Sequence, residues 1–526
     1  MNRLNSYIER YKLVFSLLLS NVLLGSLMLF SSWHYEATDD YVMARIASGA
    51  YSGTPDAHLV FIHYLYGQVV AVLYRLLPSI EWYTWLFVGF HFVSLTTLTV
   101  MLFDIKHLKL RYLAIFALCA LEVRIFYFIQ FTTVAAVLAT TGLLLVFRNR
   151  SGWQLLGGCV CFLLAVTIRF HAAMLVGAIA ALFYPLYTLK NGFSIRQAGA
   201  LAVCVALAFA LRVYNRQVYR QDAAWNHYYQ YNTLRGQIND NPYSRRLYRH
   251  LPEGVSVFDY YLLCKFFPDW EVLTLEDLQT IQQSLRQDRH MHGINRVMKR
   301  MWKEYHMIIW LLLCLFVATF FRYHPRQWLL WLPILGLVGL TVYVDMHSVF
   351  KDRVFITMYM PALMFLTLLE KERMGRISST ILLLTGGCWL GLTVRETALD
   401  NNSHLAEYRS VQEKIPMSAV YSNLSIATGS EYTPPLQLTS HKGAHYVGRG
   451  WLSAIPFDEA YASFRTYLQD NAYLITYNAE SEEHPSPFPP CVTALVRSLE
   501  LNDSIYCKPV LLEKTDHFIL LQLHEK

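Results

Sequence analysis

Charged residues are scarce in this chain. Only 16% of its 526 residues are Asp, Glu, Lys or Arg, whereas 54% are hydrophobic, and the mean hydropathy is +0.28. Such a chain cannot cover an apolar core of matching size with polar surface, which excludes an ordinary soluble protein. The composition therefore indicates a polytopic α-helical membrane protein whose helices face lipid.

A continuous basic face, an internal repeat and a low-complexity tract are also missing. The net charge is +7, but Lys and Arg fall in short clusters between apolar segments, so we expect no nucleic-acid partner. Without a repeat, the sequence gives no support to an inverted-repeat transporter. No clear small-residue cleavage site follows the apolar run from Leu13 to Phe30, so we expect a membrane span there and not a removed signal peptide.

Cysteines with the spacing of metal ligands are absent too. Seven of the nine cysteines have no ligand spacing, and most lie in apolar runs where a thiol behaves as a small hydrophobe. Cys491 and Cys507 lie in the polar C-terminal region and could form a disulfide if that region faces an oxidising compartment. Sequence spacing alone does not establish the geometry that such a bond needs.

About eleven apolar segments have the length needed to cross roughly 30 Å of hydrocarbon. We predict spans at residues 13–31, 83–103, 112–129, 130–147, 154–169, 171–188, 197–214, 304–321, 327–344, 354–370 and 378–394. The stretch 59–77 is also apolar and long enough to span, so a second criterion is needed to assign it.

The positive-inside rule supplies that criterion. If the amino terminus is cytoplasmic and 59–77 lies flat on the membrane, five short basic loops all return to the cytoplasm. These loops are DIKHLKLR, RNR, LKNGFSIR, FRYHPR and EKERMGR. We therefore predict a juxtamembrane helix at 59–77, within a first outer loop of residues 32–82.

Two further regions are then extracytoplasmic. Residues 215–303 form a large outer loop, and residues 395–526 follow the last predicted span. The tail contains strand-like pieces (SAVYSNLSI, AYLITYN, HFILLQLH) and helix-like pieces (DEAYASFRTYLQD, PPCVTALVRSLEL). This alternation indicates a small C-terminal α/β domain, so we predict a membrane domain over 1–394 and an extracytoplasmic domain over 395–526.

An acidic pair, Asp39 and Asp40, directly follows the first predicted span. Thr38 can cap a short juxtamembrane helix that runs to Ser48 and stops at Gly49, with both carboxylates in its first turn. The simplest interpretation is that the helix dipole favours negative charge there. The alternative is catalysis, and because adjacent helical residues point about 100° apart, at most one of the two would face a given site.

The same loop holds two weaker candidates. Asp56 lies in the sequence GTPDAH, where an Asp is by default a turn residue, and it could also act as an auxiliary acid. His58 follows it and is a candidate for substrate binding, while a metal site formed with His63 is an alternative that nothing else in the loop supports.

Cations interrupt later apolar stretches at the predicted outer face. Arg169 and His171 lie in the turn TIRFHAAM, where ionisable groups are candidate functional residues, although Arg169 could instead extend to lipid headgroups. A second cluster in HSVFKDRVF precedes the tenth predicted span and contains His347, Lys351, Asp352 and Arg353. Near the outer end of the third span, Glu122 and Arg124 are predicted to form an internal ion pair.

Carboxylates from the first loop and cations from later turns suit transfer of a sugar from a polyprenyl phosphate. A carboxylate can remove the proton of the acceptor hydroxyl, while Arg or Lys stabilises the departing phosphate. One base acting opposite one leaving group implies inversion at the sugar carbon.

The acidic TDDYVMARIASG segment, the 59–77 helix, the TIRFHAAM turn and the DRVFITMYMP segment together resemble the GT-C superfamily of membrane glycosyltransferases. The architecture is similar to that of protein O-mannosyltransferases and lipid A aminoarabinose transferases. The resemblance implies Asp39 or Asp40 as catalytic base, and Arg169, His171 and Arg353 as contacts to the donor phosphate. Relatives often have an acidic residue followed by a Pro-rich segment at this place, whereas this chain has GTPDAH, which leaves the role of Asp56 open.

Several alternatives stay open. A polymerase of lipid-linked oligosaccharides would also use a large Arg-rich outer loop, a flippase for lipid-linked glycans would also need outer cations, and a receptor or scaffold would explain the tail. The acceptor could be an envelope glycan, a lipid or a protein. Some GT-C enzymes use a divalent cation and others do not, so the sequence leaves metal dependence open and predicts no other cofactor.

Overall fold

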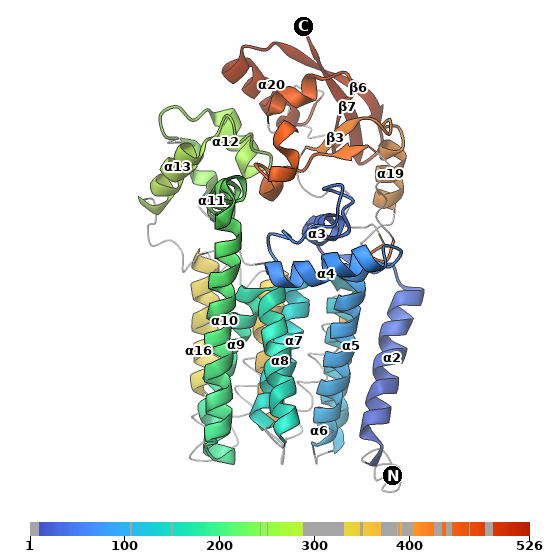
Figure 1. Cartoon of the computed structure of the whole chain (residues 1–526), viewed down its shortest axis with the longest axis vertical. Coiled ribbons are helices and arrows are strands. Elements are labelled where there is room, and N and C mark those ends of the chain that lie inside the picture. The colour runs from blue at the N-terminus through green and yellow to red at the C-terminus, as the bar shows by residue number, and fades with distance from the viewer. Residues whose placement is uncertain are drawn as a thin grey trace.

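The structure is a computed structural model in which helices form one end of the molecule and a sheet-containing body forms the other (Figure 1). It describes residues 10–105, 108–148, 151–241, 244–249, 251–287, 331–347, 351–369, 387, 390–391, 403–424, 434–437, 444–461, 463–478 and 488–526. The span predicted at 304–321, all but residues 387 and 390–391 of the span predicted at 378–394, and the predicted domain boundary at 394 lie outside these residues.

The helical end is a bundle of long apolar helices that run side by side (Figure 1). Its helices in the described residues are α2 (Lys12–Phe30), α5 (Trp82–Phe103), α6 (Leu108–Tyr127), α7 (Phe131–Arg148), α8 (Gly152–Ile168), α9 (Phe170–Asn191), α10 (Ile195–Gln221), α16 (Trp331–His347) and α17 (Asp352–Leu369). Five of them, α2, α5, α7, α9 and α10, are long and apolar enough to cross a membrane.

Helix α7 is the centre of the bundle. Nearly all of its residues are buried, and it packs on α5, α8, α9 and α17. Gly142 of α7 faces Gly158 of α8 so closely that a Cβ added to either residue would lie 2.6 Å from the other's carbonyl oxygen. Two small residues at one crossing let the helices approach closely, a common way to join membrane helices.

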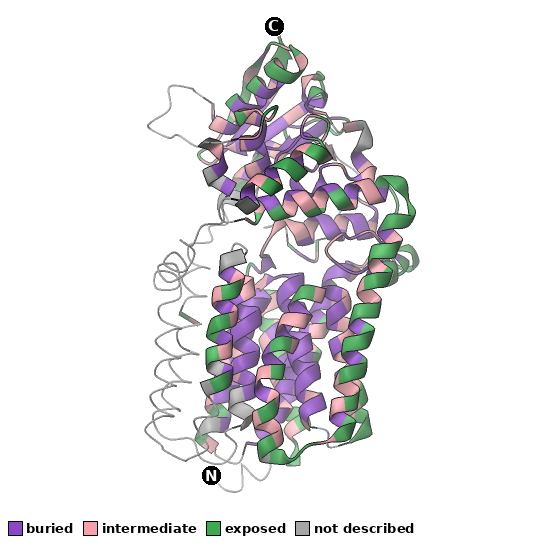
Figure 2. Cartoon of the chain, turned by 90° about the vertical axis from the view of Figure 1, so that its left-hand side faces the viewer, coloured by how far each residue is buried: buried purple, intermediate pink, exposed green. Residues whose placement is uncertain are grey.

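The outer surface of the bundle is apolar, in contrast to that of a soluble helical protein. Buried residues gather along its interior (Figure 2), and large hydrophobic side chains on α2 and α10, including Leu18, Val22, Val203 and Phe209, are exposed. Exposed apolar belts on long helices indicate contact with lipid. The chain is therefore a multi-pass membrane protein, as its composition predicted.

Ion pairs tie three helices together at the end of the bundle near the amino terminus. The Lys12 Nζ lies 2.5 Å from an Asp104 oxygen, and Arg148 pairs with the other oxygen of that carboxylate. The predicted basic loops after α5 and α7 therefore lie at the same end as the start of α2. The carboxyl terminus lies at the opposite end (Figure 1).

The first outer loop folds onto that opposite end. Strand β1 (His34–Tyr35) pairs in parallel with β2 (Phe128–Ile129), which fixes the start of the loop beside the turn between α6 and α7. Helix α3 (Thr38–Ser48) follows and ends at Gly49, whose φ of 84° suits a glycine C-cap. The predicted cap was wrong by one residue, because Thr38 is the first helical residue and Ala37 occupies the N-cap position.

Helix α4 (Tyr64–Leu76) lies flat across the end of the bundle (Figure 1), so the stretch 59–77 contains a helix that runs across the bundle as predicted, although residues 59–63 are not helical. Its start is held by two bundle helices, because His63 N–H donates to Thr167 O at 2.8 Å and Tyr64 N–H donates to the Asn215 side chain at 2.8 Å. One face of α4 is buried, while Val69 and Leu76 of the other face are exposed.

The large outer loop predicted at 215–303, which we call the second outer loop, continues from α10 and contains several helices. These are α11 (Ala223–Asn239), η1 (Ser244–Arg249), α12 (Val257–Cys264) and α13 (Leu275–Gln287). Helix α12 packs on the C-terminal helix α20 (Pro490–Asp503), where Ser498 Oγ donates to Asp259 at 2.5 Å and Asn502 Nδ2 donates to it at 3.1 Å. The second outer loop and the tail therefore pack together on the same side of the bundle.

The tail contains a mixed five-stranded sheet. Its strands are β3 (Val420–Asn423), β4 (His445–Tyr446), β5 (Ala472–Tyr477), β6 (Cys507–Lys514) and β7 (Phe518–Glu525), and their order in space is β4-β3-β5-β7-β6. Strand β3 pairs in parallel with β4 and β5, whereas β7 is antiparallel to β5 and β6. Three of these strands correspond to the predicted strand-like pieces, whereas β4 and β6 were not predicted.

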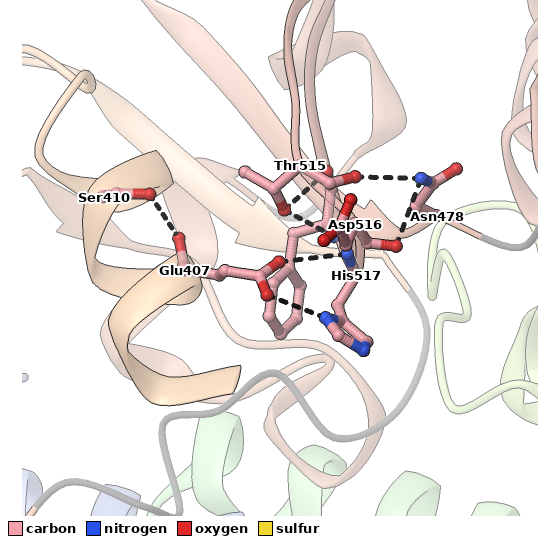
Figure 3. A network of polar contacts seen from close by, with 7 residues as sticks. Glu407, Ser410, Asn478, Thr515, Asp516 and His517 are labelled. Atoms are coloured by element: carbon pink, nitrogen blue, oxygen red, sulfur yellow. Dashed lines mark hydrogen bonds and ion pairs between the residues drawn. The ribbon is translucent and has the colours of Figure 1, made fainter. Parts of the chain in front are cut away.

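Helices cover both faces of this sheet. Leu474 and Leu521 pack on α20, and their neighbours Ile475 and Leu520 pack on α19 (Ser403–Gln412), as alternation along a strand requires. Helix α20 confirms one helix-like piece, whereas the other forms the short 3-10 helices η5 (Pro456–Tyr461) and η6 (Phe464–Leu468). Glu407 of α19 accepts two hydrogen bonds from His517, which fastens α19 to the β6–β7 turn (Figure 3).

Two pairings expected from the sequence differ in the structure. Cys491 of α20 and Cys507 of β6 are both free thiols buried in the core between this helix and the sheet, so the suggested disulfide is not formed. The Glu122 carboxylate lies 2.7 Å from His91 Nδ1 of α5, and Arg124 lies over the Phe128 ring. The partner of Glu122 was missed because it lies on a different helix, which sequence spacing cannot indicate.

Candidate functional site

A cavity of about 830 Å³ lies between the end of the membrane bundle and the body formed by the second outer loop and the tail. It is lined by α3, by the starts of α7 and α17, by the turn between α8 and α9, by α11, and by the 3-10 helix η4 (Gly450–Leu452). Within the part of the chain that the structure describes, six cationic side chains and three carboxylates line it. Segments from all three predicted outer regions therefore meet at one site.

The acidic pair is divided between this cavity and the protein interior. Asp39 lines the cavity, and its carboxylate has no hydrogen-bond or ion-pair partner among the residues that the structure describes. Asp40 is 0% exposed and does not line the cavity. The helical geometry predicted that at most one of the two would face the site, and the structure identifies Asp39 as that residue.

Asp40 instead joins three elements beneath α3. Its Oδ1 accepts a hydrogen bond from Tyr83 Oη at 2.8 Å and another from Phe131 N–H at 3.1 Å. Phe131 is the first residue of α7, so its N–H has no partner within the helix and Asp40 supplies one. Burial raises the pKa of the Asp40 carboxyl well above its usual range. These contacts are structural, and they do not bring Asp40 to the cavity surface.

Arg169 lies at the turn between α8 and α9 and lines the cavity. Its guanidinium lies over the rings of Phe61 and Phe131, at 5.3 and 5.1 Å from their centroids. Burial and the nearby charge of Arg353 lower its pKa to about 10, while Asp39 acts in the opposite direction. Arg169 therefore stays cationic at neutral pH, and two aromatic rings hold its orientation.

Lys351 and Arg353, which flank the start of α17, also line the cavity. The Lys351 Nζ lies 3.9 Å from an Asp240 oxygen, and burial together with Arg353 lowers the pKa of Lys351. The Arg353 guanidinium has no hydrogen-bond or ion-pair partner in the described part of the chain. We call Asp39, Arg169, Lys351 and Arg353 the cavity floor, because they lie at the membrane end of the cavity.

The opposite side, which we call the distal wall, is formed by residues of α11 and their neighbours. It carries Arg235 together with Asn232, Thr233, Gln237, Asn239 and Gln282. Lys265 and Arg449 complete the cationic lining. The sequence analysis did not select these residues as site candidates. Asn232 and Asn239 nevertheless lie three residues before and four residues after Arg235, a spacing that places all three on one helix face and could have indicated a polar site.

Other predicted site residues lie away from the cavity. Asp56 Oδ1 accepts hydrogen bonds from the backbone and from the ring of His58, both at 2.7 Å, and the His58 ring stacks on Trp225. Burial raises the pKa of the Asp56 carboxyl, but its hydrogen bonds with His58 outweigh burial and lower this pKa overall. His171 is exposed on α9, 3.4 Å from an Arg212 nitrogen. None of these three residues lines the cavity.

Metal-ligating side chains do not gather at this site. In the described ranges no three His, Cys, Asp or Glu residues lie close enough together to hold a metal ion. The backbone of His347 ends α16, and Asp352 begins α17. The described lining of the cavity offers carboxylates, cations, amides and aromatic rings.

Comparisons with known proteins gave two solved structures. No protein-family model and no curated protein matches the chain. The chain is similar to the crystal structure of ArnT from Cupriavidus metallidurans bound to undecaprenyl phosphate, at 10% sequence identity, and to the same protein in the apo state, at 11%. Each comparison covers 97% of both chains and has a TM-score of 0.41.

Proposed function

We propose that this protein is a membrane glycosyltransferase that moves a sugar from a polyprenyl-phosphate donor to an acceptor of the cell envelope. The observation that carries the proposal is the cavity floor, where a carboxylate without a partner lies in one cavity with cations that have few or no partners. Because this floor is at the end of the membrane helices, a lipid-linked phosphate could reach it while its prenyl chain stays in the bilayer.

The cations of the floor suit a departing phosphate. The Arg169 guanidinium contacts two aromatic rings, and the guanidinium of Arg353 lies nearby with its donors available to a ligand. A guanidinium offers paired N–H donors that match phosphate geometry, and Lys351 adds a mobile point charge. These side chains would stabilise the negative charge that develops on the phosphate as its bond to the sugar breaks.

Asp39 suits the role of general base. It would accept the proton of the acceptor hydroxyl while the acceptor oxygen forms a bond to the anomeric carbon, and the bond from that carbon to the phosphate oxygen would break. The lipid phosphate leaves with the electron pair of that bond. The configuration at the anomeric carbon inverts, because the attacking and leaving oxygens occupy opposite sides.

The position of the cavity distinguishes this proposal from the transport alternative. A flippase needs a polar pathway through the bilayer, whereas the lining residues gather at one end of the bundle. A polymerase of lipid-linked oligosaccharides would use the same chemistry with a longer donor glycan. We expect the end of the bundle that carries the cavity to face the extracytoplasmic side, following the positive-inside rule.

A comparison of cell-envelope glycans among strains tests the proposal. Strains would carry the native chain, a deletion, Asp39→Asn or Arg353→Gln, with protein levels matched by immunoblotting. We expect both variants to reproduce the glycan change caused by the deletion. Normal glycans in both variants, at native protein levels and with an altered profile in the deletion strain, would contradict the proposed site.

A further inference from the structure

Arg235 of the distal wall is a buried cation whose guanidinium forms no ion pair with a described carboxylate, although Asp240 and Asp39 act on it from a distance. It is only 5% exposed, and its hydrogen bonds go to neutral amide oxygens. Nε and Nη2 donate to Asn232 Oδ1 at 3.0 and 2.8 Å, and Nη1 donates to Asn239 Oδ1 at 3.1 Å. No described carboxylate forms an ion pair with it. A buried charge without a counter-ion is costly unless a ligand provides one.

The buried Arg449 of the same cavity provides a contrast. Its Nε donates to Tyr467 Oη at 2.9 Å. Burial alone would lower the pKa of Arg449, but Tyr467 and Asp269 outweigh burial and raise this pKa. At Arg235 burial dominates and lowers the pKa, although Tyr228 and Asp240 act in the opposite direction. The protein therefore stabilises the charge of Arg449 by itself, whereas Asp240 and Asp39 offset the burial of the Arg235 charge only in part.

The amides that hold Arg235 are themselves fixed. Asn232 Nδ2 donates to Tyr228 Oη at 3.2 Å, and Tyr228 Oη donates to Trp451 O at 2.7 Å. Asn239 Nδ2 donates to Leu263 O at 2.7 Å. A guanidinium has five N–H groups, and the three bonds to these amides leave two for a ligand. The arrangement is a rigid fork with free donors at the cavity surface.

The surroundings of Arg235 favour a ligand rich in hydroxyl groups. Neutral side chains that can both donate and accept hydrogen bonds belong to the same distal wall, namely Thr233, Gln237 and Gln282. Amides and hydroxyls of this kind pair with sugar hydroxyls, which also donate and accept. The distal wall therefore differs from the floor, where unpaired charges dominate.

We infer that the distal wall binds an acidic, polyhydroxylated acceptor and that Arg235 contacts its carboxylate or phosphate group. The identification of this ligand as the acceptor rests on the proposed function, in which the floor holds the donor phosphate. Arg235 is then the residue that selects acidic over neutral acceptors, because an uncharged acceptor would leave its guanidinium without a directly bonded counter-charge.

Titration of the purified full-length protein in detergent tests the inference. Three probes are followed by ligand-observed NMR: methyl glucuronide, which carries a carboxylate, glucose 6-phosphate, which carries a phosphate, and the neutral methyl glucoside. We expect at least one acidic probe to bind about tenfold more tightly than the neutral one, as a charge-assisted hydrogen-bond pair typically provides. The stronger of the two acidic probes identifies the anionic group.

Three variants assign the preference to a residue. Arg235→Gln should abolish it, Arg235→Lys should retain part of it, and the matched control Arg220→Gln, at an exposed position of α10, should leave it unchanged. A thermal melt of each variant identifies any that fails to fold. If Arg235→Gln does not fold, the preference for acidic probes is judged from Arg235→Lys alone. Equal binding of charged and neutral probes by the native protein, or an unchanged preference in a folded Arg235→Gln protein, would overturn the inference.

Binding of undecaprenyl phosphate to the same proteins separates this inference from the proposed function. Arg353→Gln should weaken that binding, and Arg235→Gln should not. If the native protein does not bind undecaprenyl phosphate, the proposed function fails, while the acidic-probe preference still decides whether Arg235 is an anion site. If Arg235→Gln weakens binding of undecaprenyl phosphate as much as Arg353→Gln does, Arg235 contacts the sugar donor and the inference is wrong.

Discussion

The cavity floor and the distal wall use the same residue types in different ways. On the floor, Asp39 and Arg353 have no partner among the described residues, and Arg169 is held by aromatic stacking. On the distal wall, amides with fixed positions surround Arg235. Unpaired charges of both signs can take part in a reaction in which charge moves, whereas a cation held by neutral amides is suited to recognition.

The largest expected effect is on the floor, at Asp39. We predict that Asp39→Asn lowers the rate of sugar transfer by about 10²–10⁴-fold, the usual contribution of a general base. Binding of undecaprenyl phosphate should not weaken, because the substitution removes no donor to the phosphate. Single-turnover transfer measured beside lipid binding separates the two effects, and Asp39→Glu, which keeps a carboxylate, should retain part of the activity. A full rate in Asp39→Asn would assign the base to another residue.

The second prediction compares a cation of the floor with the cation of the wall. Arg353→Gln should weaken undecaprenyl phosphate binding about 10-fold or more, as loss of a charge-assisted hydrogen bond would. Arg235→Gln should change this affinity by less than about threefold, since the distal wall does not hold the donor phosphate in this account. Dissociation constants from titration in detergent provide the measurement. Equal losses would remove the distinction between floor and wall.

The third prediction concerns the carboxylate behind the floor. Asp40→Ala should destabilise the protein by about 1–3 kcal/mol for each of the two donors, Tyr83 Oη and Phe131 N–H, that lose their acceptor. Asp40→Asn keeps an acceptor oxygen, so it should retain most of the stability and the sugar-transfer activity. Thermal melts and transfer assays of both variants measure this. A loss of transfer in a stable Asp40→Asn protein, equal to that of Asp39→Asn, would contradict the division of the pair.

Asp40 should also make stability depend on pH. Burial raises its pKa in the folded protein, so protonation favours the folded state. This stabilisation is complete below the unfolded pKa of about 3.9 and is lost as the pH rises through the folded pKa. Melting temperatures between pH 4 and pH 9 should therefore fall less steeply for Asp40→Asn than for the native protein. Parallel curves for the two proteins would show that Asp40 does not titrate with folding.

The smallest expected effect lies far from the cavity, at the Glu407–His517 contact of Figure 3. Burial raises the pKa of Glu407, but hydrogen bonds from His517 and Thr515 together outweigh it and lower that pKa. The stabilisation from these bonds is present above the unfolded pKa and is lost as the pH falls through the folded pKa. The contact is partly exposed to solvent, so Glu407→Gln should change stability at pH 7 by less than about 1 kcal/mol. Melting curves measure this, and transfer should be unchanged. A loss of transfer would mean that the tail controls the cavity.

Sequence patterns predicted the parts of the molecule that short-range chemistry determines. The helix that ends at Gly49, the flat helix α4 and strands β3, β5 and β7 follow from capping residues, parity of the basic loops and alternation. The rule that two adjacent helical residues face different directions also predicted the separation of Asp39 from Asp40. It could not indicate which of them faces the cavity, because this depends on the contacts of Asp40 with Tyr83 and Phe131, which are distant in sequence.

The errors and omissions share a cause in tertiary packing. Glu122 meets His91 of a different helix, and His171 is exposed because the rotation of α9 turns it outward. Strand β6 places Cys507 beneath α20 without bringing it into a disulfide with Cys491. Arg235 was passed over because it belongs to a polar loop region, and only the position of α11 above the bundle makes it part of the cavity (Figure 1).

A structure of the full-length protein with undecaprenyl phosphate tests the central claim most directly. The account predicts that the phosphate lies on the cavity floor within hydrogen-bond distance of Arg169 or Arg353, with Asp39 in the same cavity and free of the phosphate. It also predicts that the prenyl chain extends along the membrane helices. A phosphate bound outside this cavity, with the floor cations not in contact with it, would contradict the account.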